Sequence, residues 1–469
     1  MENNVHYKSI TEISKLIKNK SISPVELTKY IFERIDKLDN VYKSFITLMK
    51  EDALYSAINI EKEIYNGNYK GYLHGIPIAL KDLVFTKGIP TMGGCKVLSD
   101  HIPSFDATVV NKLKASGAII LGKLNLTEAA VGGYNPEFDI PRNPWGIEYY
   151  TGGSSSGSAV ATSLGLCFAS LGSDTGGSIR FPSASCGVVG LKPTWGRVSR
   201  YGLLDLAPSL DHLGPITREV EDAAIVFDSI AGYDVYDPTS LNETVPDTLP
   251  YIDKGIDGMK IGLDEKYISD NVDSEIVESV FNCINILQKN GAKIVKVKMP
   301  ELKDYLPAWN IICSTEASIA HKDNYPSRKN DYGGWFRTWL ENGNNYSAID
   351  YANANFLRIE LNSIIKNVFS NIDVLICPSM TKLPHKIDEA VLYGDYVKRD
   401  TYFGKFTQPF DFNGAPTLSI PSGFSKSGLP LSVQFVGKHL QELKLFQVGK
   451  LYESNTEWHN INPVIISEE

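Results

Sequence analysis

The sequence lacks the features that would place it in several large classes of protein. Its 469 residues carry a net charge of −9, and no basic stretch is concentrated enough to hold a phosphate backbone, which disfavours direct nucleic-acid binding. No apolar run is long enough to cross a bilayer, and the first residues, MENNVHYKSI, contain no apolar signal-peptide core. These absences predict a cytoplasmic protein without a membrane partner.

Cysteine and histidine are few and scattered. The six cysteines form no CxxC pair, and a chain of this length does not need disulfides, so we expect free thiols in a reducing cytoplasm. The eight histidines form no HExxH motif and no His–Cys cluster, so we predict no metal ion, and we expect no cofactor. Internal repeats and low-complexity tracts are also absent.

What is present is the composition of a globular protein with a substantial core, with 43% hydrophobic and 22% charged residues. Helical and strand-like patterns alternate, which predicts an α/β fold with helices on both faces of a sheet. The expected helices are two within 11–38, then 51–66, 107–117 and 274–290. The expected strands are 73–84, 118–122, 260–263, 292–297, 374–377, 417–420 and 431–436. Residues 236–258 are acidic and rich in proline, which predicts a surface excursion.

The most informative stretch spans residues 151–193. It contains two glycine-flanked serine clusters, 152–157 and 175–178, separated by a segment that predicts one helix and one strand. A flexible Gly/Ser linker would lack the apolar run 158–168 between the clusters. We therefore expect both clusters at the same edge of the sheet.

Glycines let successive backbone N–H groups converge on one point, and Ser178 follows two of them. The amides of Thr175, Gly176, Gly177 and Ser178 are therefore candidates for an oxyanion hole beside the Ser178 hydroxyl. A plain Gly–Gly turn with a capping serine is equally compatible with this stretch alone.

A second serine pattern competes with the first. Residues 153–157, GSSSG, also fit the G-x-S-x-G elbow of α/β-hydrolases, with Ser155 as nucleophile and Asp211 and His212 as partners. The elbow needs a strand before it, whereas residues 143–150 contain Pro and Gly and do not resemble one. This Ser-His-Asp interpretation remains the weaker of the two.

Three ordered motifs carry a resemblance to a known family. GIPIALKDL is followed by GGSSSGSAVA and then by GSDTGGSIRFPSASCGVVGLKPTWGRVS, with 24 positions between Ser154 and Ser178. In these motifs the chain resembles the amidase signature family, and weaker similarity covers nearly its whole length. The resemblance implies a large mixed central sheet in a single domain, 1–469. Its parts would be N-terminal helices (1–70), a core with the catalytic residues (71–235) and a second half completing the sheet and substrate pocket (259–469).

The resemblance also implies a Ser-Ser-Lys triad. Ser178 would be the nucleophile, Ser154 a bridge entered by a cis peptide bond, and Lys81 the base. A lysine is a base only when neutral, and apolar neighbours in the strand would lower its pKa from about 10.4. Taken on its own stretch, without the resemblance, Lys81 favours a structural role. Ser155, Asp174 and Arg180 are expected to support the nucleophile.

The expected partner is a small-molecule amide. We expect a free-standing amidase, with Tyr134, Trp309 and Phe403 in its acyl pocket, and a homodimer is one expected assembly because members of the family are often dimers. The main alternative is the glutaminase-type A subunit of a tRNA-dependent amidotransferase, which would need partner subunits. Against it, Phe181 replaces the usual Gln, and the segment 404–414 has no acidic residue at its start to hold a glutamine ammonium, while Asp411 within it replaces an Asn. A catalytically silent scaffold is a third alternative, opposed by the retained triad.

Overall fold

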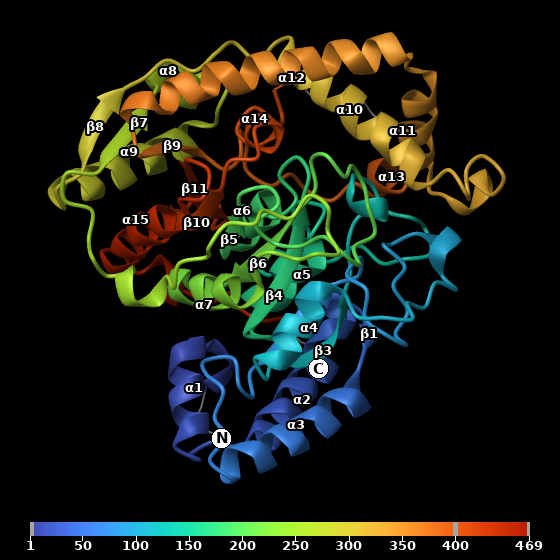
Figure 1. The fold of residues 1–469 in the computed structure, drawn as a ribbon, viewed down its shortest axis with the longest axis vertical. Helices are drawn as coiled ribbons and strands as arrows, with labels where there is room; N and C mark the ends of the chain where they lie inside the picture. Colours follow the sequence, from blue (N-terminus) through green and yellow to red (C-terminus); the bar gives the residue numbers. More distant parts are fainter. Residues whose placement is uncertain (1–3, 397–401, 467–469) are drawn as a thin grey trace.

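In the computed structural model, which describes residues 4–396 and 402–466, one sheet of 11 strands runs through the molecule (Figure 1). The strand order is β1-β3-β2-β4-β6-β5-β10-β11-β9-β7-β8, with both parallel and antiparallel neighbours, so the expected mixed sheet is confirmed. The strands are β1 (Phe45–Leu48), β2 (Pro77–Lys81), β3 (Ile119–Leu124), β4 (Ala169–Asp174), β5 (Val189–Lys192), β6 (His212–Thr217), β7 (Lys260–Leu263), β8 (Lys293–Lys296), β9 (Val374–Pro378), β10 (Thr417–Phe424) and β11 (Pro430–Gly437).

Helices cover both faces of this sheet. α5 and α6 pack on the central strands and on each other, and α7 and α15 form a second such layer. The helices are α1 (Ile10–Lys18), α2 (Pro24–Tyr42), α3 (Lys50–Tyr65), α4 (Thr108–Ala115), α5 (Ser156–Ser163), α6 (Arg180–Cys186), α7 (Val220–Ile230), α8 (Glu265–Ser269), α9 (Ser274–Lys289), α10 (Tyr305–Ala320), α11 (Gly334–Asn345), α12 (Ala348–Val368), α13 (Glu389–Leu392), α14 (Gln408–Phe412) and α15 (Glu442–Ser454). In the described part of the chain, no helix combines the length and apolar character that a membrane span requires.

Local sequence explains where the N-terminal helices begin. The Ser23 side chain accepts hydrogen bonds from the amides of Val25 and Glu26, and Pro24 occupies the first position of α2. Leu27, Ile31, Ile35 and Leu38, which recur at helical spacing along α2, are buried. The two helices predicted within 11–38 are therefore confirmed, although α2 continues to Tyr42.

One predicted strand is shorter than expected. The pattern over 73–84 predicted a strand throughout, but β2 covers only Pro77–Lys81. Before it, the Ile76 amide donates to the Leu73 carbonyl in a turn, and after it the Leu83 amide donates to the Lys81 carbonyl at 2.8 Å. The turn residues on both sides of β2 are as buried as the strand itself. The run of apolar residues therefore correctly indicated a buried segment, but it did not indicate how long the strand is. The strand consequently ends on Lys81.

The aromatic segment 301–360 forms α10, α11 and most of α12, and α12 runs along the outer edge of the molecule (Figure 1). Trp309 of α10 lies 6.2 Å from Trp339 of α11, measured between ring centroids. Residues 236–258 contain one short 3₁₀ turn, Leu249–Tyr251, and lead from α7 to β7. They connect the two halves of the continuous sheet.

Candidate active site

Two neighbouring parallel strands bring the candidate residues together. β2 pairs with β4 in parallel, so the ends that carry Lys81 and Asp174 lie at the same edge of the sheet. α5 begins at Ser156, within the first serine cluster. The Ser155 amide donates to the Ser178 carbonyl at 3.1 Å, which joins the two serine clusters. The expected placement of both clusters at one edge is therefore confirmed.

The Lys81 side chain is completely buried and contacts hydroxyl groups. Its Nζ donates to the Ser154 Oγ at 2.6 Å and to the Ser173 Oγ at 2.9 Å. Burial lowers the pKa of Lys81 to about 7, against the opposing effect of the Asp174 and Asp211 carboxylates. The peptide bond that enters Ser154 is cis. A lysine in this setting can exchange a proton with Ser154 near neutral pH.

Ser155 fixes the strand that carries Ser173. Its Oγ accepts from the Ser173 amide and donates to the Ser173 carbonyl, both at 3.2 Å. Ser173 is a site residue that the sequence analysis missed. The sequence signal that could have found it is a serine near the end of a buried strand. Because side chains alternate along a strand, this serine must point to one defined face of the sheet.

Asp174 holds the turn that carries Ser178. Its carboxylate accepts from the Gly177 amide at 2.7 Å and from the Ile179 amide at 2.9 Å, on either side of Ser178. Ser178 is 8% exposed, and within the described residues its hydroxyl makes no hydrogen bond. The nucleophile candidate is thus held by its backbone while its hydroxyl is left accessible.

Arg180 anchors this carboxylate from the other side. It bonds Asp174 at 2.7 and 3.0 Å, and its Nη2 also reaches Asp411 at 2.7 Å. Burial alone would raise the pKa of Asp174, but the Arg180 ion pair and the backbone donors outweigh it and hold the pKa well below its usual value. Asp174 therefore stays ionised while it holds the turn.

The nucleophile turn leaves no room for larger residues. A Cβ on Gly176 would lie 2.4 Å from the Trp309 ring, and one on Gly177, whose φ is +127°, would lie 2.4 Å from the Phe181 ring. The Gly177 amide is occupied by Asp174. Among the residues described, the amides of Thr175, Gly176 and Ser178 have no acceptor, so they are the donors available to an incoming oxygen.

The geometry contradicts the Ser-His-Asp alternative. Asp211 accepts from the Thr175 hydroxyl at 2.6 Å. The His212 Nδ1 lies 2.7 Å from the Leu210 carbonyl, and its Nε2 lies 3.1 Å from the Lys192 Nζ. Since the Ser155 hydroxyl bonds only the Ser173 backbone in the described structure, these side chains form no catalytic relay.

The three predicted pocket residues occupy different places. The Trp309 Nε1 donates to the Thr175 carbonyl at 2.9 Å. The Phe403 ring lies 4.7 Å from the Phe181 ring. The Tyr134 hydroxyl bonds Ser156 at 2.9 Å within a small separate core cluster. Trp309 and Phe403 therefore flank the nucleophile turn, directly and through Phe181, whereas Tyr134 supports the start of α5.

Fold and site define a hydrolase of the amide-cleaving class, and comparisons identify the family. Residues 26–446 match the family model described as Amidase. The chain is 37% identical over 457 residues to "Putative amidase AmiD" of Mycobacterium tuberculosis (strain ATCC 25618 / H37Rv), covering 97% of this chain and 96% of that protein. The chain belongs to the amidase family and is an amidohydrolase.

The chain is also similar to two proteins of different kinds. The A subunit of the glutamyl-tRNA(Gln) amidotransferase of Rippkaea orientalis (strain PCC 8801 / RF-1) is 38% identical over 485 residues, covering 97% of this chain and 99% of that protein. The peptide amidase of Stenotrophomonas maltophilia has a similar structure, with a TM-score of 0.84, 28% identity, and coverage of 96% of this chain and 97% of that one. The chain is thus similar both to a peptide amidase and to a component of an amidotransferase.

Proposed function

We propose that the chain is a free-standing amidase in which Ser178 forms an acyl-enzyme, Lys81 is the base and Ser154 relays the proton. The observation that carries the proposal is the 2.6 Å hydrogen bond between the Lys81 Nζ and the Ser154 Oγ. It joins a lysine whose pKa is lowered to about 7 to a serine beside the nucleophile segment. A neutral amine at this place is the base that serine activation requires.

In the proposed reaction, neutral Lys81 takes the proton of Ser154, and Ser154 takes the proton of Ser178. The Ser178 Oγ bonds the amide carbon while the carbonyl electrons move onto oxygen. When the tetrahedral intermediate collapses, the C–N bond breaks and the proton returns through Ser154 to the departing nitrogen. Water then repeats the sequence on the ester and releases the acid.

The oxyanion is proposed to bind the free amides of the nucleophile turn. Thr175, Gly176 and Ser178 supply these donors, and Gly177 contributes by holding the turn through Asp174. Donors fixed in a buried site need little reorganisation when charge develops on the oxygen. Asp174 and Arg180 are proposed as positioning residues because Asp174 holds the backbone of the turn and Arg180 holds Asp174.

The amidotransferase alternative is favoured by the similarity to amidotransferase A subunits such as the Rippkaea protein. A glutamine site needs a cation for the α-carboxylate and an anion for the ammonium, since an unpaired buried charge is costly. Phe181, which stands beside the nucleophile turn, supplies neither.

Ammonia release by the purified chain tests the proposal. The panel contains glutamine, aliphatic amides and aryl amides, with Ser178→Ala as the blank. We expect turnover of uncharged amides that is lost in the variant. Activity on glutamine alone would instead indicate a component of an amidotransferase, and equal activity of the variant would overturn the role of Ser178.

A further inference from the structure

A cavity of about 200 Å³ lies beside the candidate catalytic residues. Leu83, in its wall, comes two residues after Lys81. Ala129 and Ala130 follow Thr127, whose amide donates to the Ser154 carbonyl at 3.3 Å. Two of the three catalytic residues are therefore directly connected to its walls.

A third wall leads to the nucleophile turn. Leu203, Leu204 and Asp205 precede Leu206, whose amide donates to the Asp211 carboxylate at 2.9 Å. Asp211 in turn accepts from the Thr175 hydroxyl. The segment that forms this wall is therefore linked to the nucleophile turn through Asp211.

The backbone of the alanine wall is strained. Ala129 has a φ of 47° and Ala130 a φ of 61°, both in the left-handed region. Residues without glycine's freedom rarely adopt this conformation, and such outliers cluster at ligand sites. The loop is locked there by the bonds from the Ala129 amide to the Gly93 carbonyl and from the Ala130 amide to the Thr127 carbonyl.

The chemistry of the cavity is apolar. The apolar lining consists of Leu83, Cys95, Leu98, Ala129, Ala130, Leu203, Leu204 and Ala320. The polar lining is His321, Asn324 and Asp205, of which Asp205 is exposed at the rim. Burial lowers the pKa of His321 to about 4, so this ring is neutral at pH 7. Since neither lysine nor arginine lines the cavity in the described structure, an amino-acid carboxylate would find no partner there.

We propose that this cavity holds one uncharged apolar substituent of the substrate, about the size of a single aromatic ring, and that the enzyme prefers small aryl or compact alkyl amides. An apolar cavity of about 150 Å³ accommodates benzene, so about 200 Å³ accommodates a phenyl group with little spare room. The inference rests on the proposed amidase function of Ser178.

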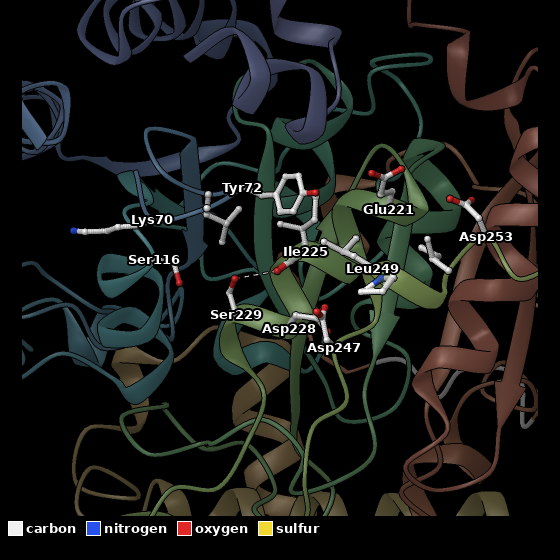
Figure 2. A pocket seen from close by; sticks show the side chains of 14 residues that line it. Lys70, Tyr72, Ser116, Glu221, Ile225, Asp228, Ser229, Asp247, Leu249 and Asp253 are labelled. Carbon is white, nitrogen blue, oxygen red and sulfur yellow. Dashed lines mark hydrogen bonds between the residues drawn. The ribbon is translucent and has the colours of Figure 1, made fainter. Parts of the chain in front are cut away.

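A second cavity supplies the matched control. It has a volume of about 530 Å³ and is lined by residues 70–73, part of α7 and residues 247–253 (Figure 2). Glu221, Asp228, Asp247 and Asp253 make its wall acidic. Its lining shares no residue with the lining of the first cavity. Filling it leaves the proposed substrate cavity untouched.

The test compares kcat/KM for benzamide and acetamide in the wild type, Leu204→Trp and Leu249→Trp. Leu204 is half-buried in the substrate cavity, and Leu249 lines the control cavity. We expect the wild type to prefer benzamide by at least about tenfold, because a methylene in an apolar pocket is worth about 10–200-fold. Leu204→Trp should remove this preference, and Leu249→Trp should keep it.

The outcomes separate this inference from the proposed function. If the wild type hydrolyses acetamide and benzamide equally well, or if Leu204→Trp leaves the ratio unchanged, the cavity assignment is overturned while the amidase stands. If no amide is hydrolysed faster than by Ser178→Ala, the proposed function itself fails. If Leu204→Trp does not fold, Leu204→Ala serves as the second variant, because it enlarges the cavity. Its ratio of kcat/KM for 4-ethylbenzamide to kcat/KM for benzamide should exceed the wild-type ratio by several-fold, and an unchanged ratio would refute the inference.

Discussion

Two completely buried lysines, Lys81 and Lys192, lie at the ends of β2 and β5. Burial lowers the pKa of each to about 7. Their partners differ. The Lys81 Nζ contacts two hydroxyls, whereas the Lys192 Nζ contacts the Ala415 carbonyl at 2.6 Å and the His212 ring at 3.1 Å. A lowered pKa alone therefore does not distinguish a base from a structural cation.

The partners decide what each lysine can do. A serine hydroxyl can give a proton to a neutral amine and take another from a neighbour, so the contact with Ser154 allows Lys81 the proposed role of base. The Ala415 carbonyl can only accept, and the His212 Nδ1 is engaged by the Leu210 carbonyl. Lys192 also lies near the carboxylate of Asp411, which raises its pKa against the effect of burial. We therefore assign Lys81 to catalysis and Lys192 to packing and charge balance.

Replacing each lysine by methionine is the strongest test of this contrast. Lys81→Met should lower kcat by about 10²–10⁴-fold, because it removes the base. Lys192→Met should keep kcat within about tenfold, because it removes no group on the proton route. Ammonia release, with circular dichroism to confirm folding, measures both. Equal losses in the two variants would contradict the assignment.

The pH dependence gives the next largest difference. Only neutral Lys81 accepts a proton, so kcat/KM should rise by about tenfold per pH unit below a midpoint near its pKa of about 7 and level off above it. Lys192→Met should leave the midpoint in place. A pH profile from 5.5 to 9 with an uncharged amide measures this, and a midpoint that moves with Lys192 would reverse the roles.

Removing Ser173 sharpens the contrast within the Lys81 site. Its hydroxyl stabilises the ammonium, so Ser173→Ala should lower the pKa of Lys81 further and move the midpoint to lower pH. We also expect kcat to fall by about tenfold, because Lys81 loses one of its two anchors. Ser170→Ala is the matched control, since Ser170 lies on the same strand but bonds the Ser158 carbonyl. An unchanged profile in Ser173→Ala would remove Ser173 from the site.

The smallest effect concerns stability and should be shared by both lysines. Between pH 7 and about 10.4 the unfolded state holds more protons than the folded state, so each lysine makes stability rise with pH in this window. Each methionine variant should flatten this rise by about 1–2 kcal/mol between pH 7 and 9. Urea denaturation at the two pH values measures it. If only one variant flattens the pH dependence of the free energy of unfolding, then burial does not lower the pKa of the two lysines to the same extent.

The proposed nucleophile, relay and base could be named from the sequence because each lies in a continuous motif that carries the family resemblance. The helix and strand between the serine clusters were likewise predicted and correspond to α5 and β4. These features depend on neighbours in the chain, and periodicity reports such neighbours well. The predicted strand over 73–84 was longer than β2, because buried turn residues produce the same apolar pattern as buried strand residues.

Contacts between distant segments were out of reach. The proposed substrate cavity is assembled from segments between Leu83 and Asn324, and of its lining residues only Leu83 belongs to one of the three motifs. The bond between Lys192 and His212 joins β5 to β6 and has no sequence signature. The three residues predicted for the pocket were chosen for aromatic character, and aromatic character does not tell a pocket wall from a packed core.

The indole of Trp309 has an optical consequence. Its Nε1 donates to the Thr175 carbonyl at 2.9 Å, and the ring packs on Gly176, so the chromophore touches the turn that would carry an acyl group. Its emission should change as Ser178 is acylated and recover as the ester is hydrolysed. Stopped-flow fluorescence could therefore time the two half-reactions in the unlabelled protein, with Trp309→Phe separating its signal from those of the other five tryptophans.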